Sequence, residues 1–83
     1  MTLLYRGPGA LITEEVFEAL TPQRQTFLIN ELEHLHVVRG RPLEIRAVYR
    51  GQLICLFHTR DRHVFGQVER ALLRALERLE DAS

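Results

Sequence analysis

The sequence predicts an α+β domain: a small antiparallel β-sheet of about five short strands, packed on one face by a C-terminal amphipathic α-helix. Two observations support this prediction. Apolar residues recur at helical spacing near the C-terminus, and two alternating segments flank a turn just before them. With 83 residues the chain has the length of one domain, with a β-rich part over 2–58 and a helix over about 61–80.

The C-terminal segment has the clearest pattern. Its apolar residues fall within one stripe about 140° wide, as in a helix that lies on a core. Thr59 or Asp61 can cap the first turn by accepting hydrogen bonds from backbone N–H groups. Gly66 costs up to about 1 kcal/mol relative to alanine, which indicates a close crossing with another element. The stripe consists of Val64, Phe65, Val68, Ala71, Leu72, Ala75, Leu76 and Leu79.

Residues 42–58 predict a β-hairpin with Arg50-Gly51 as its two-residue turn. If Tyr49 lies opposite Gln52, one face of the hairpin is apolar and is expected under the helix. The pairs on that face are Ala47 with Ile54 and Ile45 with Leu56, beside Leu43. The other face contains Val48, Leu53, Cys55 and Phe57 beside Glu44 and Arg46. That second face is more apolar than a solvated sheet face should be.

Segment 12–38 is compatible with two interpretations. Thr21-Pro22 could begin a helix that places Phe27, Leu28, Leu32 and Leu35 at helical spacing. Alternatively, residues 11–13, 16–20 and 26–29 form short strands separated by turns at 14–15 and 21–24, followed by a strand over 35–38. Residue patterns alone leave both interpretations open.

Several short segments, spread over most of the chain, keep a common order: Tyr5–Pro8, Ile12–Thr13, Phe27–Leu32, His36–Gly40, Tyr49–Gly51, Cys55–Phe57, Phe65–Val68, Arg70–Leu72 and Arg74–Leu76. In these segments the chain resembles a family of small actinobacterial proteins of unknown function. The resemblance implies strands in the first half. In that family a membrane hairpin often separates the two halves, but Gly40-Arg41-Pro42 stands at that place here. The pattern of strands and a final helix is also similar to small pleckstrin-homology-like folds of bacteria.

Charge is balanced, with eleven basic and eleven acidic residues, so no global field favours nucleic acid, and no nucleic-acid partner is expected. Every basic residue is arginine. This bias is typical of a high-GC genome, and it also provides rigid forks for phosphate or carboxylate recognition. Residues 1–38 hold five acids and two arginines, whereas 39–74 hold three acids and eight arginines. That asymmetry could orient self-association.

Few side chains are suited to catalysis or metal binding. Ser83 is the only serine and lies in the C-terminal tail, which excludes a serine triad. Cys55 is the only cysteine, so it cannot form an internal disulfide. His34 and His36 would share one face of a strand but lack the further ligands of a zinc site. We therefore predict no catalytic, cofactor-binding or metal-binding residues, and no enzymatic activity.

The first functional hypothesis is an interaction module that forms a homodimer through the sheet face opposite the helix, with any other protein partner unidentified. Its candidate interface residues are Val48, Leu53, Cys55, Phe57 and Leu73. The alternative is a peripheral lipid- or small-ligand-binding domain of pleckstrin-homology-like type. Its candidate anion contacts are Arg70, Arg74 and Arg78, at four-residue spacing on the helix's outer face. The sequence has no signal peptide or long apolar run, which predicts a cytoplasmic protein.

Overall fold

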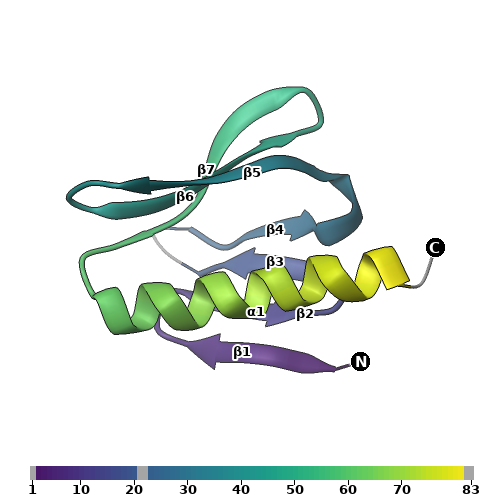
Figure 1. Cartoon of the computed structure of the whole chain (residues 1–83), viewed down its shortest axis with the longest axis horizontal. Helices are drawn as coiled ribbons and strands as arrows, with labels where there is room; N and C mark the ends of the chain where they lie inside the picture. Colours follow the sequence, from purple (N-terminus) through teal and green to yellow (C-terminus); the bar gives the residue numbers. More distant parts are fainter. Residues whose placement is uncertain (1, 21–22, 82–83) are drawn as a thin grey trace.

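The computed structural model of the chain describes residues 2–20 and 23–81. Over these residues the chain forms strands, one short 3₁₀ helix and one long α-helix (Figure 1). The elements are β1 (Leu3–Gly7), β2 (Ala10–Thr13), β3 (Val16–Ala19), β4 (Gln25–Leu28), η1 (Ile29–Glu31), β5 (Leu32–Arg39), β6 (Leu43–Tyr49), β7 (Gln52–Thr59) and α1 (Arg62–Asp81). The predicted α+β class with a C-terminal helix is confirmed.

The strands form two antiparallel sheets, β1-β2-β3-β4 and β5-β6-β7, in each of which sequential strands pair. The prediction of a single sheet with about five strands is therefore wrong. The cause lies between β4 and β5, where η1 takes the place of a hairpin turn. Ile29 in η1 is buried, so this connection turns into the core and directs the chain into a second sheet.

The first half consists of strands, and the alternative helix beginning at Thr21-Pro22 is wrong. Thr21 and Pro22, where that helix would begin, lie outside the described part of the chain. The residues that would continue it form strands instead, β4 over 25–28 and β5 over 32–39. Ile12 of β2 pairs with Phe17 of β3, and both side chains are buried. Packing between neighbouring strands thus fixes a segment whose local pattern is ambiguous.

The turn of the β6–β7 hairpin is the predicted one. Arg50 and Gly51 have φ angles of 52° and 82°, the two positive values that a type I′ turn requires. Tyr49 pairs with Gln52 on either side of this turn, as expected. Arg50 donates two hydrogen bonds of 3.0 Å to the carboxylate of Glu31, which connects the hairpin tip to η1.

The predicted hairpin register is correct near the turn and wrong further from it. Ala47 pairs with Ile54 as expected, but Ile45 pairs with Phe57 rather than with Leu56. A β-bulge gives β7 one extra residue at this point, so the alternation of faces is interrupted. Leu56 and Phe57 are consequently both buried.

Helix α1 follows the predicted stripe closely. Asp61 caps it, because its Oδ1 accepts hydrogen bonds from the backbone N–H groups of His63 and Val64. Thr59 supports the cap by accepting from the N–H of Asp61. The buried residues of the helix are Phe65, Val68, Ala71, Leu72 and Ala75, with Val64 and Leu76 partly buried. Only Leu79 departs from the prediction, since it is exposed near the helix end.

Both sheets and α1 contribute to one hydrophobic cluster. The helix contacts β1, β2 and η1 on one side of this cluster and β6 and β7 on the other, and Figure 1 shows it lying across the four-stranded sheet. Among the described residues, no helix is long and apolar enough to cross a membrane.

The close crossing expected at Gly66 is absent. A Cβ atom built there would meet only the guanidinium group of Arg70, at 3.4 Å or more, which is a flexible neighbour. We therefore expect Gly66→Ala to raise the free energy of unfolding by about 0.5–1 kcal/mol, because alanine loses less backbone entropy in a helix. Urea denaturation of both proteins measures this difference, and a destabilised variant would contradict the open placement of Gly66.

Candidate functional site

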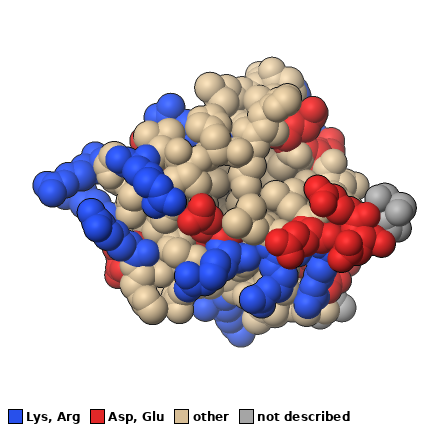
Figure 2. Space-filling view, in the orientation of Figure 1, with Lys and Arg blue, Asp and Glu red and all other residues tan. Residues whose placement is uncertain are grey.

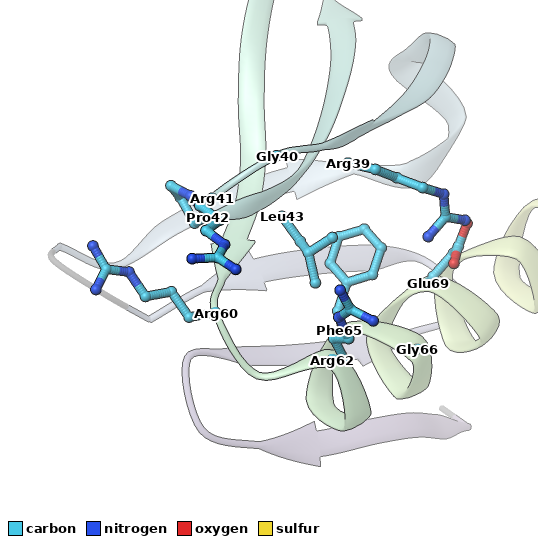
Figure 3. Close-up of a pocket in the computed structure, with 10 residues that line it drawn as sticks. All are labelled: Arg39, Gly40, Arg41, Pro42, Leu43, Arg60, Arg62, Phe65, Gly66 and Glu69. Atoms are coloured by element: carbon cyan, nitrogen blue, oxygen red, sulfur yellow. The ribbon is translucent and has the colours of Figure 1, made fainter.

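An open cleft of about 900 Å³ lies at the end of the molecule where α1 begins (Figure 3). Its walls come from the β5–β6 connection and from the segment that leads from β7 into the first turns of α1. The volume lies within the range of small-molecule binding sites.

The strand register explains why these two segments meet. Leu43 at the start of β6 pairs with Arg39 at the end of β5 and with Thr59 at the end of β7. The three residues form one row across the sheet, so the segments that follow β5, precede β6 and follow β7 all lie at the same end of the sheet. Arg41 lies in the β5–β6 turn and Arg60 directly follows Thr59. The ladder thereby places basic residues that are distant in the sequence beside one cleft.

Four arginines, all exposed, line the cleft: Arg39, Arg41, Arg60 and Arg62. Glu69 is the only carboxylate among the described residues that line it, and Figure 3 shows its side chain pointing toward Arg39. Within residues 2–20 and 23–81, none of the four guanidinium groups forms an ion pair. The arginines that do form ion pairs lie elsewhere: Arg24, Arg46, Arg50 and Arg78. The cleft therefore has a local positive charge of three, although the chain as a whole is neutral.

The remaining lining of the cleft is mostly apolar. Pro42 and Leu43 are half-buried and Phe65 is buried, so the base of the cleft is continuous with the hydrophobic core. The backbone N–H groups of His63 and Val64, in the first turn of α1, already donate hydrogen bonds to Oδ1 of Asp61. They are therefore not free to bind a ligand in the cleft. The donors that the cleft offers are thus arginine side chains above an apolar base.

The structure separates the three predicted anion contacts on the helix. Arg78 forms an ion pair with Glu14 and is not available as a free cation. Arg70 and Arg74 are exposed and line a shallow groove of about 200 Å³ beside Tyr5 of β1. In Figure 2 basic side chains gather at the end where α1 begins and along the helix, and acidic side chains gather where it ends.

The predicted interface residues do not form one surface. Phe57 is wrong as an interface residue, because the bulge in β7 turns it into the core, where only 7% of it is exposed. Leu73 is 44% exposed but lies on α1. Val48 and Leu53 are directly paired across the β6–β7 hairpin, with Cys55 two residues further along β7. Leu53 is the most exposed large apolar residue in the described part of the chain, at 66%.

Polar residues occupy much of the same sheet face, which is therefore less apolar than the sequence predicts. Arg46 forms an ion pair of 3.0 Å with Glu44, and it pairs across the sheet with His36 on β5. We define the apolar corner as Val48, Leu53 and Cys55, at the hairpin end of this face.

Neither the cysteine nor the histidines show an activated arrangement. Partial burial raises the pKa of the Cys55 thiol and nearby Glu44 raises it further, the opposite of the lowered pKa of a reactive thiolate. His34 has a φ of 52° and lies in a bulge of β5, so the expected regular alternation with His36 is not maintained. The described residues contain no group of three or more histidine, cysteine or acidic side chains placed to hold a metal ion.

The cleft arginines were not among the candidate residues predicted from sequence. A signal for them was present, because Arg39-Gly-Arg41 and Arg60-Asp-Arg62 lie just beyond the two ends of the predicted hairpin. Antiparallel pairing must bring these two segments together at the open end of the hairpin. Extending the register outward from the Arg50-Gly51 turn would have located this basic cluster.

Neither a protein-family model, nor a curated protein, nor a solved structure matches the chain, so the proposals below rest on its own residues and their arrangement.

Proposed function

We propose that the chain is a small interaction module that forms a homodimer through the apolar corner of the β6–β7 hairpin. The exposed side chain of Leu53 is the observation that supports this proposal most directly. It lies on a strand, paired with Val48, and therefore presents a fixed apolar surface rather than a mobile one. Exposed apolar groups held in this way are typical of protein interfaces.

The position of β7 supports the same proposal. It is an edge strand of the three-stranded sheet, so one side of its backbone has no strand partner in the described chain. Its eight residues include no Lys, Arg, Asp, Glu or Pro, the residues that commonly protect sheet edges. Two copies of β7 can pair around a two-fold axis, which would bring Leu53 and Cys55 of both protomers to one shared face.

Replacing Leu53 with arginine is expected to convert the dimer to a monomer, because the interface would then contain two like charges and lose apolar area. Light scattering over a range of micromolar concentrations measures the mass of the wild type and the variant. Leu3→Arg is the matched control, since Leu3 is also an exposed leucine on an edge strand, in the other sheet.

Cys55 provides a second measurement. As the only cysteine, it can be alkylated selectively, and its modification rate should fall as the protein concentration rises and the dimer forms. A wild type that stays monomeric, or a dimer that survives Leu53→Arg, would contradict the proposal.

A peripheral ligand-binding domain of pleckstrin-homology-like type remains the second candidate function. It is supported by the order of four strands, three strands and one helix, and by the free arginines Arg70 and Arg74 on the outside of α1. Sedimentation with anionic vesicles at low salt tests this candidate. Binding should fall in the variant with both Arg70→Gln and Arg74→Gln.

Binding rather than catalysis is also part of the proposal. Among the described residues, the charged side chains that line the cleft are four arginines and one carboxylate, Glu69. This set supplies charge but little capacity for proton transfer. We place the module in the cytoplasm, because the chain has a single cysteine and therefore no internal disulfide of the kind typical of oxidising compartments.

A further inference from the structure

We infer that the arginine-lined cleft binds a compact ligand with at least two phosphate groups. The four arginines come from the end of β5, the β5–β6 turn, the residue after β7 and the start of α1, which the strand register brings to one end of the sheet beside the cleft. This inference goes beyond the proposed dimer and does not depend on it, because the cleft and the apolar corner lie at opposite ends of β6.

Seven arginines form no ion pair within the described residues, and four of these seven gather at the cleft. Each of Arg46, Arg50 and Arg78 is compensated by a nearby carboxylate. The cleft arginines have no such partner within the described residues, although like charges at one place repel each other. A cluster of four arginines with Glu69 as the one carboxylate among its described lining residues has an excess of positive charge, which suits it to an anion from outside.

Charge indicates how many anionic groups the ligand has. Four arginines and Glu69 leave a local charge of three positive. A phosphate monoester has a charge of about −1.5 to −2 at neutral pH, so two such groups balance the cleft. The planar guanidinium fork also matches phosphate oxygens in pairs, which gives short charge-assisted hydrogen bonds.

Shape indicates that the ligand is compact. The volume of about 900 Å³ suits a small molecule or a lipid headgroup. Its base of Pro42, Leu43 and Phe65 can contact an apolar ring or carbon frame. A long nucleic acid would need an extended basic surface, whereas acidic side chains gather at the other end of the molecule (Figure 2).

Titration calorimetry with inorganic pyrophosphate and with inositol hexakisphosphate tests the inference directly. We expect both to bind the wild type, more tightly at low salt. Arg41→Gln combined with Arg60→Gln should weaken binding by about tenfold for each arginine, because hydrogen bonds to charged groups are worth roughly one decade of affinity each. Both side chains are exposed, so the variant should keep the wild-type unfolding curve.

Two further variants make the test specific. Arg6→Gln with Arg24→Gln removes the same charge at exposed positions that line neither the cleft nor the groove beside α1, and should change the affinity by less than about threefold, since its effect is only long-range. Glu69→Gln should tighten binding, because it removes a negative charge from the lining of the cleft. Leu53→Arg should leave binding unchanged, which separates this inference from the dimer proposal.

The source of the phosphate groups is resolved by a vesicle experiment. Phosphatidylcholine vesicles are compared with and without a phosphorylated inositol lipid, and free inositol hexakisphosphate is added as competitor. Vesicle binding that the competitor abolishes identifies a lipid headgroup, and pyrophosphate binding without vesicle binding identifies a soluble phosphate compound. Single-stranded RNA serves as a further probe in the same titration. The inference is overturned if neither phosphate probe binds, if both double variants lose equal affinity, or if RNA is the only probe that binds.

Discussion

Replacing Leu72 with alanine is expected to lower the free energy of unfolding by about 2–5 kcal/mol. Leu72 lies in the middle of α1 and its side chain is 0% exposed, within the cluster that joins the helix to both sheets. Truncation loses the transfer free energy of the buried carbons and leaves a cavity that the two sheets cannot close fully. Urea denaturation followed by circular dichroism measures the change.

Leu73→Ala is the matched control for this prediction. Leu73 is the next residue of the same helix, but it is 44% exposed and lies outside the hydrophobic core. Its replacement should change the free energy of unfolding by less than about 0.5 kcal/mol. Leu76→Ala should fall between the two, because Leu76 is only partly buried. Equal losses at positions 72 and 73 would contradict the orientation of the helix.

The helix could be predicted because its signal is local. Its apolar stripe repeats every 3.6 residues, and its cap at Asp61 depends on backbone groups two and three residues away. Only Leu79 was misjudged, and it lies in the last turns of the helix, where the stripe continues although the side chain is exposed. How far the sheets extend beneath a helix is a property of the tertiary fold.

The strands of the first half were harder to predict for the opposite reason. Each of β2, β3 and β4 has four residues, too few for a clear alternating pattern. Their stability comes from pairs such as Ile12 with Phe17, which belong to different strands. The division into two sheets depends on η1, whose buried Ile29 has no distinctive local sequence.

The candidate sites show the same contrast between local patterns, which the sequence reveals, and contacts between distant segments, which it does not. The helix arginines were found because they repeat every four residues on one face, but the partner of Arg78 is Glu14, which is distant in the sequence. The cleft depends on which strand ends meet, so periodicity along one element could not indicate it. Register extended from a reliable turn is the inference that connects local sequence to such a site.

Phe57→Arg is expected to lower the free energy of unfolding by more than about 4 kcal/mol, because it places an unpaired charge in the core and removes an aromatic ring. A domain of this size has a total stability near the lower end of roughly 5–15 kcal/mol. The variant should therefore show little or no cooperative unfolding transition in urea. A sequence-based register without the bulge predicts the reverse, a folded protein with a changed surface.

Comparing Phe57→Arg with Leu53→Arg tests whether β7 contains the bulge. A regular β7 would place residues 53 and 57 on the same face, four positions apart, and the same substitution would then have similar effects at both. The bulge at Leu56 instead leaves Leu53 in solvent and turns Phe57 into the core. Leu53→Arg should thus keep a monomer-sized, cooperatively folded domain, while Phe57→Arg unfolds it and Phe57→Leu costs far less. Two folded arginine variants would show that β7 is regular, and would return Phe57 to the proposed interface.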